Sequence, residues 1–380
     1  MKLNSYPQNN FSRRTVLRGI VKLSLLGLGV AALPGCEIFG NLGPSDFDDP
    51  GLGAFARFKG RQYGAAVQSG QLDDATFNNA LCKEVTMIVP ETELKWDAIR
   101  PAQDSFDFSG YHKLAHFAGA NDIRMRGHVL LWHLANPPWL KPALARRDKA
   151  ERILEEHIFR VVGETSGVIR NWDVVNEAIH PHSTRADGLR QTLWLEALGP
   201  DYVAMAFRMA HEADRGLTLV YNDYGTENGD GDGNHKRQCI LRLLEKCKMD
   251  KVPIHAFGLQ SHLQAHKPLA DGEFKSFLKE VRSLGLKIYI TELDLDISHL
   301  NGRADDKIKI AQKYVHSYLD LVQDGAPVDM LLTWGLSDRY TYMHMLRPEV
   351  IGALPLDREL NHGPLWETLV TGWLKYKAVV

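Results

Sequence analysis

The chain has 380 residues, of which 44% are hydrophobic and 24% are charged, and its 45 Lys and Arg against 47 Asp and Glu leave a formal net charge of −2. These fractions are ordinary for a soluble globular protein and argue against a disordered, collagen-like or polytopic membrane chain. A net charge near zero gives no overall positive potential that would attract a polyanion, so no nucleic-acid partner is expected. Four cysteines exclude a disulfide scaffold.

The first 36 residues are predicted to be an export signal. Arg13 and Arg14 stand just ahead of an apolar run, Leu23 to Leu33, whose 11 residues are too few to span a bilayer but suit the core of a signal peptide. This pattern resembles a twin-arginine signal. We therefore expect an exported protein that is periplasmic, membrane-tethered, on the cell surface or secreted.

The segment that follows the signal is predicted to carry an anchor and a spacer. Leu33-Pro34-Gly35-Cys36 resembles a lipoprotein cleavage box, so Cys36 is a candidate lipid anchor, although Pro34 replaces the usual small residue. A plain cysteine behind an ordinary signal is the alternative. Residues 37–53 are rich in Gly, Pro and Asp and are predicted to be a flexible spacer. Residues 54–380 are then expected to form one domain, acting as a monomer.

From residue 54 onward, short apolar runs alternate with longer amphipathic segments. Strands are predicted over 62–68, 84–90, 124–132, 169–177, 218–224, 256–263, 287–294 and 329–336, with helices such as 150–165, 234–249 and 305–323. Nearly continuous apolar strands are typical of parallel sheets covered on both faces. Eight such units predict an α/β fold, a single (β/α)8 TIM barrel. A doubly wound sheet is the alternative, but no GxGxxG follows the first strand.

Carboxylates stand where two of the predicted strands end. Glu177 ends the strand over 169–177, and Glu292 lies near the end of the strand over 287–294. In a barrel, the C-terminal strand ends form the active site. Two carboxylates there are the minimum for glycoside hydrolysis, in which one protonates the leaving oxygen and the other attacks the anomeric carbon or activates water. Alone, the pair is equally compatible with structural ion pairs.

Five motifs at predicted strand ends are more specific. They are ETELKWDAIRP (91–101), RGHVLLWH (126–133), WDVVNEA (172–178), GLQSHL (258–263) and ITELDL (290–295). Together and in this order they resemble glycoside hydrolase family 10, the retaining endo-β-1,4-xylanases, over nearly all of residues 54–376. The resemblance implies a catalytic domain that hydrolyses β-1,4-linked xylan or xylo-oligosaccharides by double displacement. It also implies that no cofactor and no metal are needed.

The resemblance assigns five residues to catalysis. Glu177 matches the general acid/base, and Glu292 matches the nucleophile. His262 matches the histidine that bonds the nucleophile, and Asp294 matches the carboxylate that orients this histidine, a pair that would hold the nucleophile ionised. Asn176 would bond the 2-hydroxyl of the sugar in the cleavage subsite, a contact that strengthens in the transition state.

Further residues are implied to bind the sugar, because aromatic faces suit the C–H-rich face of a pyranose and polar side chains suit its hydroxyls. The implied set is Glu91, Lys95, His128 and Trp132 on the glycone side, Trp334 beneath the cleaved sugar, and Gln260, Asn222 and Tyr342. Gln260 is expected to point the same way as His262 on one strand. Asn222 and Asp223 are expected to shape the aglycone side. The His128–Val129 peptide bond is expected to be cis, and Trp172 is expected in the core.

Three positions depart from the family pattern. Thr92 stands where Asn is usual, Ala135 where Gln is usual, and Tyr342 where a second Trp is usual. The first two remove hydrogen-bond partners from the subsite next to the cleaved sugar, which weakens discrimination among sugars. The same chemistry on a decorated or different β-glycan is therefore the alternative reading of the substrate.

Other functions have weaker support. His128 with His133, and His180 with His182, suggest ligand pairs of a metal-dependent hydrolase, but no zinc-type spacing accompanies them. Residues 228–234 hint at a calcium loop but lack the Gly at position six and the closing Glu, so a plain loop is expected. A non-catalytic sugar-binding protein would be expected to have lost a carboxylate or its orienting partners, and this chain keeps them.

Overall fold

The computed structural model describes residues 50–343 and 352–376. The predicted export signal, Cys36 and most of the predicted spacer lie outside these residues, so the interpretation of this segment stays a prediction. Among the described residues, no helix is both long enough and apolar enough to cross a membrane.

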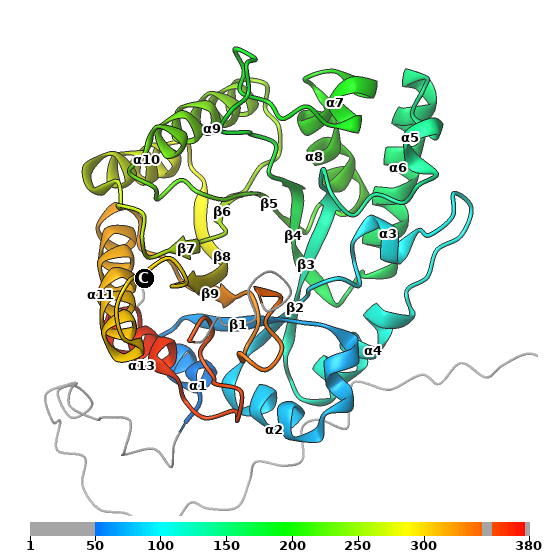
Figure 1. Ribbon diagram of the computed structural model, residues 1–380. Coiled ribbons are helices and arrows are strands. Elements are labelled where there is room, and N and C mark those ends of the chain that lie inside the picture. Colours follow the sequence, from blue (N-terminus) through cyan, green and yellow to red (C-terminus); the bar gives the residue numbers. More distant parts are fainter. Residues whose placement is uncertain (1–49, 344–351, 377–380) are drawn as a thin grey trace, which may run out of the picture. The chain divides into compact units, whose positions relative to one another are not determined.

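Parallel strands close into a barrel, which confirms the predicted (β/α)8 fold (Figure 1). Their order is β6-β5-β4-β3-β2-β1-β9-β8-β7, and pairing of β6 with β8 closes the ring. The strands are β1 Gln62–Val67, β2 Met87–Pro90, β3 Arg124–Leu131, β4 Ile169–Asn176, β5 Thr218–Asp223, β6 Ala256–Leu259, β7 His262–Gln264, β8 Lys287–Asp296 and β9 Met330–Thr333.

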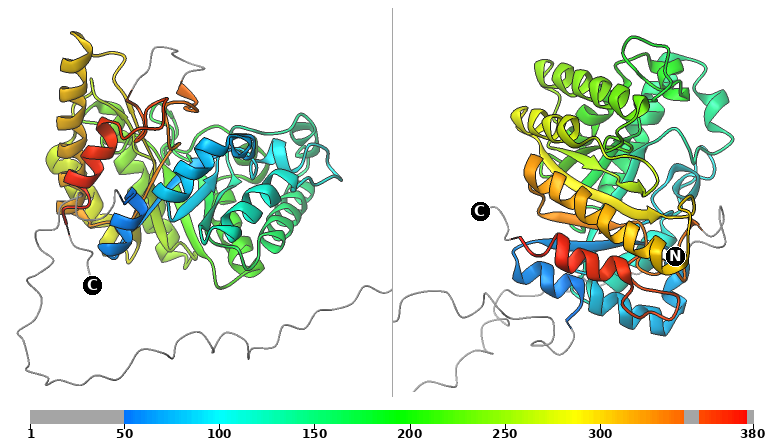
Figure 2. Two further views of the ribbon diagram at one scale, coloured as in Figure 1. Left: turned by 90° about the horizontal axis from the view of Figure 1, so that it is seen from below. Right: turned by 60° about the vertical axis from the view of Figure 1, so that its left-hand side comes forward.

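Helices surround the barrel (Figures 1 and 2). They are α1 Leu52–Phe58, α2 Ala75–Glu84, α3 Trp96–Ile99, α4 Ser109–Ala120, α5 Leu140–Ala143, α6 Arg147–Glu164, α7 Leu193–Leu198, α8 Tyr202–Ala213, α9 Gly231–Met249, α10 Asp271–Ser283, α11 Ala304–Gly325 and α13 Pro364–Gly372, with a 3₁₀ turn, η2, at Ser69–Asp73. The helices predicted over 234–249 and 305–323 lie within α9 and α11, and the helix predicted over 150–165 matches α6 except for Thr165, one residue past its end. In α10, Phe274, Leu278 and Val281 are buried at helical spacing, which gives the helix one apolar face toward the barrel.

Several predicted boundaries are wrong. The strand predicted over 84–90 starts only at Met87, because α2 continues to Glu84. The folded part begins before residue 54, because α1 starts at Leu52, whose side chain is fully buried and whose N–H donates to Glu84 Oε2 at 2.9 Å. The strand predicted over 256–263 is two strands, β6 and β7. Ser261 between them has a φ of +64°, in the left-handed region, and this breaks the two-residue alternation of the strand.

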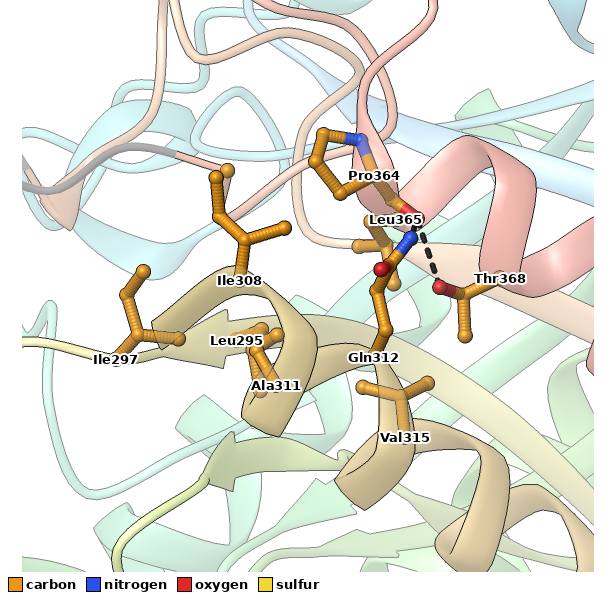
Figure 3. Close-up of a pocket in the computed structure, with 10 residues that line it drawn as sticks. Leu295, Ile297, Ile308, Ala311, Gln312, Val315, Pro364, Leu365 and Thr368 are labelled. Atoms are coloured by element: carbon orange, nitrogen blue, oxygen red, sulfur yellow. Dashed lines mark hydrogen bonds between the residues drawn. The ribbon is translucent and has the colours of Figure 1, made fainter. Parts of the chain in front are cut away.

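A narrow apolar cleft lies in the helical layer, between the end of β8, α11 and α13 (Figure 3). Leu295, Ile297 and Ile308 line it on one side, and the Thr368 hydroxyl donates to the Pro364 carbonyl at 2.7 Å on the other. None of the ten residues that line it is titratable. The cleft is therefore a gap in helix packing without groups for acid–base chemistry.

The outer face of the sheet, which the helices cover, is close-packed where β3 passes β4. Trp172 is fully buried, as expected, and a Cβ added at Gly127 would come within 2.4 Å of three atoms of its indole. Only glycine lets the two strands approach this closely, and this approach fixes the position of the residue that follows, His128.

We expect Gly127→Ala to lower the free energy of unfolding by about 1–3 kcal/mol, because the indole has no free space to move into. Chemical denaturation monitored by circular dichroism would measure this loss. Gly119→Ala in α4 is the matched control, since an added Cβ there meets nothing within 4 Å. Equal stability of the two variants would contradict the close packing inferred at Gly127.

Candidate active site

The two predicted carboxylates open at the same mouth of the barrel. Glu177 follows the last residue of β4, and its N–H donates to the Asn222 carbonyl of β5 at 2.9 Å. Its φ of +57° places a non-glycine residue in the left-handed region, a conformation that concentrates at functional sites. Glu292 lies within β8 and is buried.

His262 is held between two carboxylates. Its Nε2 lies 3.1 Å from Glu292 Oε2, and its Nδ1 lies 2.8 Å from Asp294 Oδ2. Burial lowers the pKa of His262, but Asp294 and Glu292 together raise it well above its ordinary value. The ring therefore carries a proton on each nitrogen and donates to both carboxylates. Burial raises the pKa of Asp294, and the charge of His262 and a hydrogen bond from the Tyr342 hydroxyl oppose this shift. The Tyr342 ring lies 6.1 Å from that of His262, centroid to centroid.

A second group of charged side chains lies beside Glu292, and it was not predicted from the sequence. Asp173 of β4 is fully buried and accepts two hydrogen bonds from Arg126 of β3 and one from His128, whose Nδ1 lies 3.0 Å from its Oδ2. The same Nδ1 is 3.9 Å from Glu292 Oε1. The signal was present in the sequence, because Arg126 and Asp173 are charged residues in the middle of two predicted strands.

These residues also bear on the metal-dependent alternative. Ligand atoms of His128, Asp173 and Glu292 lie within 4.8 Å of one another. Arg126, however, already supplies Asp173 with a paired positive charge. A divalent cation would have to displace this guanidinium, so the donor set fits a hydrogen-bonded charge network better than a metal site.

The environments of the two glutamates move their pKa values apart. Burial raises the pKa of Glu177, and the nearby charges of Asp223 and Glu292 raise it further. Burial alone would raise the pKa of Glu292 as well, but the hydrogen bond from His262 and the field of His128 bring it below its ordinary value. Of the two, Glu177 is the group that keeps its proton to higher pH, and Glu292 is the group that ionises first. This division suits an acid and a nucleophile.

Three amides connect the two carboxylates. Asn222 Nδ2 donates to Glu292 Oε1 at 2.6 Å and to Asn176 Oδ1 at 2.9 Å. Gln260 Nε2 donates to the same Asn176 oxygen at 2.9 Å and to Glu177 Oε1 at 3.1 Å. The expectation that Asn222 shapes the aglycone side is therefore corrected. Its side chain is fully buried, and its amide group positions Glu292 through a hydrogen bond.

The residues implied for the glycone side also gather at the mouth. Lys95 Nζ lies 5.0 Å from the centroid of the Trp132 ring and 5.8 Å from that of Trp334. The ring centroids of His128 and Trp334 are 5.0 Å apart. The His128–Val129 peptide bond is cis, as expected. Glu91 is buried beside them, and burial raises its pKa to about 6 although Lys95 opposes the shift. Rings and charged groups thus form one face suited to a sugar.

On the other side of Glu177 lie Arg190 and His133, two residues that the sequence motifs did not assign to catalysis or sugar binding. Arg190 Nε donates to the Glu177 carbonyl at 2.9 Å, and its Nη2 lies 3.8 Å from Glu177 Oε2. His133 Nδ1 lies 3.6 Å from the same oxygen. Burial and the charge of Arg190 lower the pKa of His133 to about 4, so this ring is neutral at neutral pH.

We expect Asp294→Asn to lower the pKa of His262 and, through the loss of that positive charge, to raise the pKa of Glu292. Titration of the protein by NMR, following the His262 ring nitrogens and the Glu292 carboxyl carbon, would measure both shifts. Asp305→Asn, an exposed change of the same charge on α11, is the control. An unchanged pKa of Glu292 would show that His262 does not hold this carboxylate ionised.

Comparisons with known proteins agree with this type of site. A sequence model described as glycosyl hydrolase family 10 matches residues 51–371. The endo-1,4-beta-xylanase B of Paenibacillus barcinonensis is 32% identical over 292 residues, which cover 74% of this chain and 85% of the relative. The endo-1,4-beta-xylanase B of Thermotoga neapolitana is 31% identical over 284 residues, which cover 75% of this chain and 79% of the relative.

Solved structures are similar as well. Native xylanase 10B from Thermotoga maritima superposes with a TM-score of 0.76 at 30% identity, covering 86% of this chain and 98% of that one. Xylanase 10B from Thermotoga petrophila in complex with xylobiose superposes with a TM-score of 0.75 at 29% identity, covering 86% of this chain and 97% of that one.

Proposed function

The chain belongs to glycosyl hydrolase family 10, and from this premise we propose that it is an endo-β-1,4-xylanase acting on xylan or xylo-oligosaccharides with retention of configuration. The observation that carries the proposal is the pair Glu177 and Glu292. They share one barrel mouth and their pKa values move in opposite directions. Two carboxylates and water suffice for this reaction, so no cofactor is needed.

In the first step, Glu292 attacks the anomeric carbon while Glu177 gives its proton to the departing glycosidic oxygen. The nucleophile is aimed by its hydrogen bonds from His262 and Asn222. The C–O bond to the leaving sugar breaks as the bond to Glu292 forms. The products are a covalent glycosyl-enzyme ester, a deprotonated Glu177 and a free sugar hydroxyl.

In the second step, the carboxylate of Glu177 takes a proton from water, and the oxygen of this water attacks the anomeric carbon. The ester bond breaks and Glu292 returns as a carboxylate. Two inversions at one carbon give net retention. Gln260, which donates to Glu177 Oε1 at 3.1 Å, keeps this carboxyl group in place through both steps. Asn176 is proposed to bond the 2-hydroxyl of the reacting sugar.

The substrate assignment rests on the aromatic glycone face and on the relatives. Trp132 and Trp334, bridged by Lys95, offer flat apolar surfaces beside cationic and anionic groups. Among similar structures, a xylanase from Thermoanaerobacterium saccharolyticum was solved as a variant with xylotetraose. Together these favour a chain of β-1,4-linked xylose.

A decorated or different β-glycan is the second candidate substrate, and it rests on Thr92 and Ala135. Ala135 has a φ of +52°, and its carbonyl accepts a hydrogen bond from the Asp97 N–H at 3.0 Å. Its methyl group cannot replace the amide that the family usually has at this position. Fewer groups are then available to select the sugar next to the cleavage point.

We expect the full-length protein to release xylo-oligosaccharides from linear and substituted xylan, and Glu292→Gln to release none, because the glycosyl ester cannot form. Glu177→Gln is expected to lose about 10²–10⁴-fold in kcat/KM on xylan. It should lose less on an aryl xylobioside whose leaving group needs no proton. Mass spectrometry of the products and initial rates would measure these effects. Release of products from β-glucan alone would contradict the xylan assignment.

Export by the twin-arginine route is proposed from residues 1–36, with Cys36 as a lipid anchor and a monomeric catalytic domain. Arg13→Lys with Arg14→Lys is expected to leave the protein in the cytoplasm, because this pair is what the proposed route reads. Cys36→Ala is expected to move it from the membrane fraction to the soluble exported fraction. Cell fractionation with an antibody would measure both. Unchanged fractionation of the Cys36 variant would leave an ordinary signal peptide as the interpretation.

A further inference from the structure

The junction between β6 and β7 carries two of the residues that hold the catalytic carboxyl groups. Gln260 Nε2 donates to Glu177 Oε1 at 3.1 Å. His262 Nε2 lies 3.1 Å from Glu292 Oε2. Both side chains therefore point into the barrel mouth, although the strand is interrupted between them. The backbone conformation of this short junction thus bears on the acid and on the nucleophile at once.

Ser261 lies between these two residues and is turned toward the helices. Its φ of +64° is rare for a non-glycine residue and has to be held by surrounding contacts. The Ser261 hydroxyl donates to the Leu259 carbonyl at 3.2 Å, and it lies 2.5 Å from the hydroxyl of Tyr318 on α11, the helix outside β7 (Figure 1). A serine hydroxyl has one hydrogen, so Ser261 donates to Leu259 and accepts from Tyr318.

The Tyr318 hydroxyl is fixed within the helical layer. Tyr318 is fully buried, and its ring stacks on that of Phe274 in α10, with the centroids 5.9 Å apart. Glu227, and Tyr314 one turn earlier in α11, are titratable groups beside it. Burial, and then the charge of Glu227, raise the pKa of Tyr318 well above its ordinary value. The phenol therefore stays protonated and keeps donating to Ser261.

The backbone of the junction is also bonded to the strand that carries the nucleophile. The Gln260 carbonyl accepts from the Glu292 N–H at 3.0 Å. The Ser261 carbonyl accepts from the Asp294 N–H at 3.3 Å. A rotation of the backbone at Ser261 would weaken these bonds and would turn His262 away from the two carboxylates of β8 that it contacts.

We propose that Tyr318 is a positioning residue for the reaction: its hydroxyl holds Ser261 in the left-handed conformation and thereby aims His262 at the nucleophile. The inference rests on the proposed xylanase function. Tyr318 lies in the helical layer outside the sheet, so it acts through the backbone of Ser261 and not on the sugar. A single hydrogen bond then links the packing of α10 and α11 to the ionisation of Glu292.

The test is Tyr318→Phe in the full-length protein. A less well-aimed His262 is expected to raise the pKa of Glu292, since burial alone would raise it. The acidic limb of kcat/KM on a linear xylo-oligosaccharide should move to higher pH by about 0.5 unit. At the pH optimum, kcat should fall by about three- to tenfold, the loss of one hydrogen bond, with KM nearly unchanged because the weakened contacts are to carboxylates.

Tyr314→Phe is the matched control. It removes the same hydroxyl one turn earlier in the same helix. In the described part of the chain this hydroxyl is buried without a hydrogen-bond partner. The control is expected to leave kcat and the acidic limb as in the wild type. Circular dichroism would check that both variants fold. An acidic limb that shifts equally in the two variants would overturn the inference, because loosened helix packing would then explain it.

Ser261→Gly separates positioning from a general loss of stability. Glycine adopts a positive φ readily, so in this background the bond from Tyr318 is no longer needed to hold the junction. Tyr318→Phe is therefore expected to lower kcat in the wild type and to have little further effect on kcat or on the acidic limb in the Ser261→Gly background. An equal loss in both backgrounds would show that Tyr318 acts by another route, and the inference would fall.

A readout without substrate distinguishes this inference from the underlying function. The pKa of Glu292, followed by NMR on its carboxyl carbon, is expected to be higher in Tyr318→Phe than in the wild type and unchanged in Tyr314→Phe. A wild-type value in Tyr318→Phe would overturn the role of this tyrosine. Failure of the wild-type protein to hydrolyse the linear compound would instead refute the xylanase proposal, and the NMR comparison would still decide what Tyr318 does.

Discussion

The charged ring of His262, held between Asp294 and Glu292, is the interaction on which the site depends. A buried carboxylate with no partner would take up a proton, and a protonated Glu292 cannot attack carbon. The ring prevents this by donating to Glu292 at 3.1 Å, and it can do so because Asp294 at 2.8 Å keeps it charged. His128, itself supported by Asp173 and Arg126, adds positive character on the opposite edge of the nucleophile.

The amides of Asn176, Asn222 and Gln260 link this arrangement to the acid on β4. The N–H₂ groups of Asn222 and Gln260 each donate to one carboxylate and to the shared Asn176 oxygen, so Glu177 and Glu292 are positioned by one network across β4, β5 and β8 and the junction after β6. Displacement of a single strand would misplace both carboxylates together. The close approach of Gly127 to Trp172 and the parallel register of the strands are therefore requirements of the chemistry as well as of the fold.

The barrel and the two glutamates were predictable because strand runs and motifs are local in sequence. In the folded barrel, the residues at the C-terminal ends of the strands then lie together at one mouth. The direction of Asn222 and the contact of Arg126 with Asp173 were not predictable in this way, because they depend on the register between neighbouring strands. The break at Ser261 depends on one backbone angle that its residue type does not signal. Arg190 reaches Glu177 from thirteen residues away through the fold of a loop.

Arg190 places a constraint on the acid beside it. Arg190 lies 3.8 Å from Glu177 Oε2, and a cation at that distance favours the ionised carboxylate, which would remove the proton that the leaving group needs. Two features oppose it. Burial raises the pKa of Glu177, and Asp223 adds negative charge from the end of β5. Because Lys236 fixes Asp223 in place, a guanidinium group and a carboxylic acid with a raised pKa can exist side by side. Asp223, which the sequence suggested as a residue of the aglycone side, thus acts on that side through the proton of Glu177.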